Sequence, residues 1–165
     1  RARGPEYVRV VTTCYKEAVE AYCKGTYSEE KIADWNERLA AVFNRGFWDG
    51  YYLGQRLGEW THRYGSGATK RKVYVGKAIK HFGNIGVTEF LVETQSVKPG
   101  DELLITGPTT GAVFVTADDI RVDLATVPEA IRGDYFSIKT TEKIRPNDQL
   151  YKMVAANRVG TAHER

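Results

Sequence analysis

The stretch Val97-Lys98-Pro99-Gly100-Asp101-Glu102-Leu103 decides the fold of the second half of this 165-residue chain. Its Pro-Gly-Asp core is typical of a chain reversal, and the apolar residues on either side are typical of strands. Further runs rich in Val, Ile, Phe and Tyr follow from Val73 onward, and they are separated by the turn signals Gly83-Asn84, Gly107-Pro108, Gly133-Asp134 and Pro146-Asn147-Asp148. Six or seven strands at a spacing of roughly ten residues predict a small closed antiparallel β-barrel over residues 72–154.

Two segments within this region invite a functional interpretation. Gly107 to Gly111 has the glycine spacing of a phosphate-binding loop, but no Lys-Ser/Thr pair and helix follow it, so a hairpin turn is predicted. Asp119 to Leu124 alternates, which predicts a strand with Ile120, Val122 and Leu124 on one face. The carboxylates of this segment are therefore interpreted as solvent-facing groups rather than as a cation site.

The first half of the chain has the period of helices. Apolar residues recur three and four positions apart from Pro5 to Lys24, at Tyr7, Val10, Val11, Cys14, Ala18, Ala21 and Tyr22. Ser28 can cap a second helix that runs to Phe43, with a buried stripe at Ile32, Trp35, Leu39 and Val42 or Phe43. The predicted fold class is therefore α+β, with a helical connector over residues 1–64 followed by the barrel.

The remaining segments are interpreted as irregular. Glycines at positions 46, 50, 54 and 58 alternate with aromatic residues, and the charged residues among them exclude a membrane helix. Residues 65–71 are small, polar and then basic, which predicts a linker, and residues 155–165 are predicted to be a flexible tail. The longest run of aliphatic and aromatic residues, Leu39 to Phe43, excludes a membrane span, and no membrane partner is expected.

The chain is poor in catalytic residue types, with 2 Cys and 3 His. Cys14 and Cys23 fall on roughly opposite faces of the first predicted helix, which excludes a mutual disulfide or a shared metal, and Cys14 is predicted to be buried. No two histidines have the spacing of a zinc site. We therefore expect no catalytic residue, no metal and no cofactor in this chain, and the cysteine usage favours a cytoplasmic protein.

Because no catalytic site is expected, the remaining class of function is the binding of a partner or substrate. The net charge is +3, and residues 1–72 carry 13 basic and 9 acidic groups against 11 and 12 in residues 73–165. Aromatic and basic side chains are interleaved where the helices end, so they could stack on bases or contact a collagen-like chain. Packing of the rings onto the barrel, or onto another domain, is the preferred interpretation. The candidate substrate-binding residues are Arg45, Trp48, Tyr51, Arg56, Trp60, Arg63 and the basic run Lys70, Arg71 and Lys72.

Two stretches resemble the collagenase-like peptidase family U32. One is Arg3 to Ala18, which contains Tyr7-Val8 and Tyr15, followed by the aromatic and glycine-rich stretch Asn44 to Gly54. The other, from Val75 to Lys152, is similar to the C-terminal domain of that family.

The same second stretch resembles the β-barrel of domain two in translation factors such as elongation factor Tu. The matching segments are Val97 to Leu103, Ala130 to Ile138 and Ile144 to Leu150.

The resemblance implies a division of labour within a longer protein. The cysteine-bearing signature and metal-cluster ligands of the family have no counterpart here, so we expect an accessory part whose partner is an upstream catalytic domain of the same chain. The expected role is to position a macromolecular substrate, and RNA (tRNA or rRNA) is slightly favoured because related barrels contact RNA. The alternatives are recognition of a collagen-like peptide and a purely structural buttress or oligomerisation module.

Overall fold

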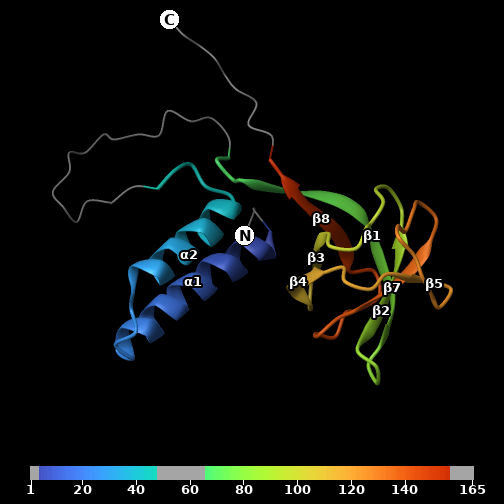
Figure 1. Cartoon of the computed structure of the whole chain (residues 1–165), viewed down its shortest axis with the longest axis horizontal. Helices are drawn as coiled ribbons and strands as arrows, with labels where there is room; N and C mark the ends of the chain where they lie inside the picture. The colour runs from blue at the N-terminus through green and yellow to red at the C-terminus, as the bar shows by residue number, and fades with distance from the viewer. Residues whose placement is uncertain (1–3, 48–65, 157–165) are drawn as a thin grey trace, which may run out of the picture. The chain divides into compact units, whose positions relative to one another are not determined.

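The computed structural model describes residues 4–47 and 66–156 of the chain, which divides into two compact units (Figure 1). One unit comprises Arg1–Lys70 with Ala155–Arg165, and the other comprises Arg71–Val154. We call the described parts of these the helical unit and the strand unit.

The helical unit contains two helices that lie side by side, α1 (Pro5–Cys23) and α2 (Glu29–Ala41) (Figure 1). The predicted cap is confirmed, because the Ser28 hydroxyl accepts a hydrogen bond from the Lys31 N–H at 3.4 Å. The buried stripe is confirmed at Trp35, which packs with Cys14 and Ala21 in a small core. Tyr22 does not belong to that core, since 78% of it is exposed.

Eight strands form one antiparallel sheet in the order β4-β3-β8-β1-β2-β7-β5-β6. Their bounds are β1 Lys70–Phe82, β2 Val87–Val92, β3 Glu102–Gly107, β4 Gly111–Thr116, β5 Arg121–Val122, β6 Ala125–Thr126, β7 Tyr135–Lys139 and β8 Gln149–Ala155. The α+β class is confirmed. Among the described residues no hydrogen-bonded pairing joins β4 to β6, so the predicted closure into a barrel is not confirmed.

The core of the strand unit lies on one face of the alternating strands. β2 buries Thr88, Phe90 and Val92, and β7 buries Phe136 and Ile138, with the rings of Phe90 and Phe136 stacked at 5.6 Å. The residues between them point away from the core. The side chains of these residues form a continuous outer face on β2 and β7.

Three turns of the strand unit share one construction, and the first of them is Lys98-Pro99-Gly100-Asp101. In residues 98–101, 131–134 and 145–148, the closing aspartate accepts the N–H of the residue three positions earlier, at 2.8, 2.8 and 2.9 Å. The third residue of each turn has a positive φ, at Gly100, Gly133 and Asn147. The residues before the turns, Val97, Ala130 and Ile144, are buried. Each turn therefore fixes the direction in which a core strand begins.

The structure corrects two predictions and confirms a third. The alternating strand over Asp119 to Leu124 is wrong, because β5 stops at Val122 and the next two residues form the tip of a hairpin with φ of 49° and 68°. Lys70 and Arg71 begin strand β1 and are not linker residues. The hairpin turn at Gly107 to Gly111 is confirmed, since these two glycines pair at the end of β3 and β4.

Candidate functional site

The structure describes four of the nine residues predicted to bind substrate. Trp48, Tyr51, Arg56, Trp60 and Arg63 lie outside the described residues. Arg45 is exposed and follows the end of α2. The basic run Lys70, Arg71 and Lys72 lies on β1, where a regular strand holds it in place.

The strand divides this basic run between two faces. Successive side chains of a strand point in opposite directions, so Lys70 and Lys72 share one face with Tyr74. Arg71 lies on the other face, which it shares with the buried Val75. The three cations therefore form no single patch, and only two of them accompany an aromatic side chain.

Lysine and tyrosine side chains contact one another on the outer face of β1 and β8. The Lys72 ammonium lies 5.0 Å from the centroid of the Tyr151 ring, and the Tyr74 ring meets Tyr151 edge-on at 5.6 Å. The Tyr74 hydroxyl donates to a Glu93 carboxylate oxygen at 2.6 Å, and the Lys77 ammonium lies 3.0 Å from the other oxygen. We call these five residues the cation–aromatic cluster.

Two groups of this cluster have pKa values displaced from their usual range. Burial, followed by the hydrogen bond to Glu93, raises the pKa of Tyr74 to about 12, so its hydroxyl stays protonated. The bonds from Tyr74 and Lys77 hold the pKa of the Glu93 carboxyl below its usual range. Neither group is a proton acceptor poised near neutral pH, and what the cluster offers a ligand is aromatic rings and positive charge.

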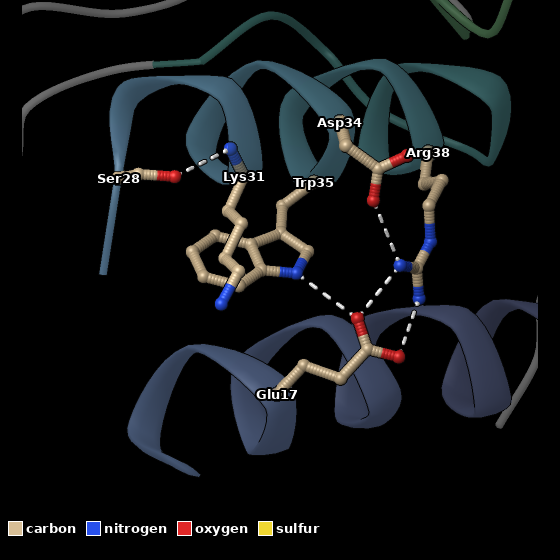
Figure 2. Close-up of polar contacts among 6 residues, drawn as sticks. All are labelled: Glu17, Ser28, Lys31, Asp34, Trp35 and Arg38. Atoms are coloured by element: carbon tan, nitrogen blue, oxygen red, sulfur yellow. Dashed lines mark hydrogen bonds and ion pairs between the residues drawn. The ribbon is translucent and has the colours of Figure 1, made fainter. Parts of the chain in front are cut away.

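A second polar cluster joins the two helices (Figure 2). One Glu17 carboxylate oxygen accepts hydrogen bonds from the Trp35 indole at 3.0 Å and from Arg38 at 2.7 Å, and the other accepts from Arg38 at 3.1 Å. Asp34 accepts a further bond from the same guanidinium at 3.0 Å. The Arg38 contact lowers the pKa of Glu17, so this carboxylate is a fixed charge that holds α1 to α2.

Two described residues with reactive side chains, Cys14 and His81, are held in the interior or by hydrogen bonds, whereas the Cys23 thiol is exposed. Cys14 is buried between the helices and burial raises the pKa of its thiol, which makes it a poor nucleophile. His81 Nδ1 lies 2.8 Å from the Thr88 hydroxyl, which in turn lies 2.7 Å from that of Thr140. Within residues 4–47 and 66–156, no group of three His, Cys, Asp or Glu side chains is arranged to hold a metal. No helix in the same part of the chain is long and apolar enough to cross a membrane.

Sequence reasoning missed a groove on the outer face of the strand unit. It is a hollow of about 430 Å³ between the tip of the β1–β2 hairpin, the tip of the β5–β6 hairpin and β7. Leu124 lines it and is 93% exposed. The sequence pattern concealed this residue, because alternation assigned Leu124 to the same face as the buried Ile120.

Comparisons with known proteins match a family profile to the first part of the chain and individual relatives to nearly all of it. Residues 1–62 match the profile of peptidase family U32. The chain is 62% identical over 152 residues to a protein named collagenase from Porphyromonas gingivalis, and 27% identical over 154 residues to an uncharacterized protease of Methanocaldococcus jannaschii. Each alignment covers 92% of this chain but only 37% of the relative, so it includes the strand unit.

A comparison with solved structures finds crystal structures described as the C-terminal domain of a Geobacillus thermoleovorans protein assigned to the U32 peptidases. One of them matches 48% of this chain and 90% of its own length, with a TM-score of 0.46 and 16% identity. The sequence matches confirm the resemblance seen in the motifs around Tyr7 and Gly46.

Proposed function

We propose that this chain belongs to the U32 peptidase family, because residues 1–62 match the family profile, and that it is the non-catalytic C-terminal accessory part of a longer protein. In this proposal it positions a macromolecular substrate for a catalytic domain that lies upstream in the same protein. The length of the relatives supports the proposal, because this chain spans only 37% of the collagenase. The location of the protein in the cytoplasm stays a prediction.

RNA is the substrate that we propose first, and the observation that carries it is the cation–aromatic cluster. Lys72 and Tyr151 present a positive charge and a ring on adjacent strands of a sheet. Single-stranded nucleic acid is bound by this combination, because ammonium groups contact phosphates and rings stack on bases. Since strands hold these side chains, less conformational freedom is lost on binding than in a linker.

A polypeptide is the second candidate substrate, and it is supported by the relatives. The 62% identical protein is named collagenase, and the Methanocaldococcus relative is named a protease. The half-buried tyrosine rings of the cation–aromatic cluster also suit a proline-rich or collagen-like chain.

The helical unit, in the same proposal, docks on the catalytic domain. Val8, Tyr15, Val19 and Tyr22 are exposed on α1 at spacings of seven, four and three residues, which forms a stripe along the helix. The buried Cys14 and Ala21 lie on the face toward α2, so this stripe is a second apolar face. The match of residues 1–62 to the family profile supports its burial against the rest of that family's conserved domain. If the chain is a purely structural buttress, this docking is its whole function and it binds no substrate.

Titration of the chain with tRNA and with a triple-helical collagen peptide, at low and at high salt, tests the substrate. We expect tRNA to bind with an affinity that falls steeply with salt, and the Lys72→Gln variant to reduce the slope of log K against log salt by roughly 1. Tyr151→Leu should weaken binding by about tenfold through lost stacking. Lys143→Gln, which removes an exposed lysine elsewhere in the strand unit, is the matched control.

Three results would count against RNA. Equal behaviour of the Lys72 and Lys143 variants would show that the cluster is not the binding surface. Salt-insensitive binding of the collagen peptide, lost in Tyr151→Leu, would favour the polypeptide substrate. If neither ligand binds, the buttress is favoured.

A further inference from the structure

Helix α1 has an apolar arc that is wider than one neighbouring helix needs. At about 100° per residue, its apolar residues span an arc of roughly 200°, whereas a stripe of about 100° is enough to face one neighbour. Cys14 and Ala21 occupy one side of this arc and pack toward α2. The other side is exposed, so the sequence of α1 is patterned for a second neighbour in addition to α2.

The exposed side of the arc has the spacing of a seam between two helices. Five residues follow one another at distances of four, three, four and three positions, and the four apolar ones are between 45% and 78% exposed. They are Val8, Thr12, Tyr15, Val19 and Tyr22, and we call them the α1 seam. A repeat that averages 3.5 residues is the pattern along which two helices pack lengthwise, at a crossing angle of about 20°. The seam is roughly 21 Å long at 1.5 Å per residue, so it matches a neighbour whose axis is nearly parallel to that of α1.

Thr12 is the polar member of the seam, and its own helix satisfies its hydroxyl. The Thr12 hydroxyl donates to the Val8 carbonyl at 2.7 Å and lies 3.2 Å from the Arg9 carbonyl oxygen. Burial of a hydroxyl is costly only where it loses its hydrogen bonds. A partner can therefore cover Thr12 without leaving an unsatisfied polar group in the contact.

The seam itself carries no charge. The charged residues on the exposed side of α1, Arg9, Lys16 and Glu20, lie beside the seam rather than in it, and Lys16 and Glu20 form an ion pair at 3.8 Å. The opposite border is formed by the half-buried Val11 and Ala18. Contact along the seam is therefore apolar, and its strength should depend little on salt.

We propose that the α1 seam packs lengthwise against an α-helix in the part of the longer protein that lies outside this chain. The family profile supports this partner, because it covers the helical unit and ends at residue 62, before the strand unit begins. The inference rests on the proposed function in one respect, that the partner belongs to the same protein. The helical form of the partner rests on the seam alone, and it does not depend on which substrate the strand unit binds.

The test is photo-crosslinking in the longer protein, with Val8, Tyr15 and Tyr22 replaced in turn by p-benzoylphenylalanine and the products located by mass spectrometry. We expect all three crosslinks on one segment, each step of seven residues along α1 matched by about seven along the partner, because both helices rise 1.5 Å per residue. A strand, which rises about 3.3 Å per residue, would advance by only about three residues for each step. The same group placed at Thr13, an exposed neighbour outside the seam, is the control and should give no crosslink.

Two adjacent threonines separate docking from folding of α1. Thr12→Glu places a charge in the seam, so exchange of the α1 amide hydrogens in the longer protein should be accelerated at least about tenfold. Thr13→Glu is the matched control and should leave the exchange unchanged. In the present chain alone both threonines are exposed, and neither substitution should change the exchange.

The outcomes separate the inference from the proposed function. An advance of about three residues, crosslinks to the strand unit, no crosslinks, or equal effects of the two threonine variants would overturn the helical partner. Crosslinks with the seven-residue advance on a separate polypeptide would support a helical partner and count against docking on a catalytic domain of the same protein.

Discussion

The helical unit and the strand unit bury their side chains in different ways. The core of the strand unit contains 15 buried residues, whereas three residues, Cys14, Ala21 and Trp35, form that of the helical unit. A pair of helices with so small a core has little hydrophobic stabilisation, and here a polar cluster around Glu17 supplements it. We therefore expect the strand unit to be stable by itself and the helical unit, as far as residues 4–47 show it, to depend on further contacts.

The largest expected effect is a loss of stability in the core of the strand unit that leaves the helical unit unchanged. Phe136→Ala removes a fully buried ring stacked on Phe90 and should lower the free energy of unfolding of the strand unit by about 3–5 kcal/mol. Urea unfolding followed by NMR signals of buried methyl groups measures this loss. The urea midpoint of the helix signal, measured by circular dichroism, should not change. An equal shift of that midpoint would contradict the view that the two units unfold independently.

A smaller effect tests how closely the strand unit is packed. A Cβ added at Gly107 would lie 1.8 Å from a carboxylate oxygen of the buried Asp148, which holds the 145–148 turn. Gly107→Ala should therefore cost about 2 kcal/mol of unfolding free energy. Gly83→Ala is the control, because its added Cβ would lie 3.9 Å from the nearest atoms and should change stability little. Equal stability of the two variants would contradict this account of the turn.

The smallest effect concerns the polar cluster of the helices. Because Arg38 lowers the pKa of Glu17, the carboxylate contributes stability at pH values above roughly 4.3, the ordinary value of a glutamate. That contribution is lost as the pH falls through the lower pKa of the folded state. Glu17→Gln should cost about 1 kcal/mol near pH 7, since both partners are partly exposed and screened.

Acid titration of helix content in both proteins measures this effect. The helices of the natural chain should lose stability below roughly pH 4.3, and those of the Glu17→Gln variant should depend less on pH in that range. An identical pH dependence in both would mean that the Glu17–Arg38 pair does not hold the helices.

Much of the fold could be predicted from sequence, because its signals are local. Pro5, Ser28 and the apolar period locate both helices, and Pro-Gly-Asp and Asn-Asp sequences locate the turns. The failure at Asp119 to Leu124 has a physical reason. A two-residue hairpin tip that contains no glycine alternates in hydrophobicity just as a strand does, so periodicity cannot distinguish the two.

The candidate site was less predictable, because sheet pairing creates it. The basic neighbours of Lys72 mark it as a candidate, but its partner Tyr151 lies 79 residues away and meets it only through the pairing of β1 with β8. The groove likewise depends on the register of three strands. Nothing local in the sequence marks either combination.

The difference in self-sufficiency between the two units is tested most directly by two-probe urea unfolding. With Trp48 and Trp60 replaced by Phe, Trp35 is the chain's one remaining tryptophan and reports on the helical unit. Methyl signals of Val92 and Ile138 report on the strand unit. We predict two separate transitions, with the Trp35 fluorescence changing at the lower urea concentration. A single coincident transition at both probes would contradict the account, because it would mean that the helices and strands fold as one unit.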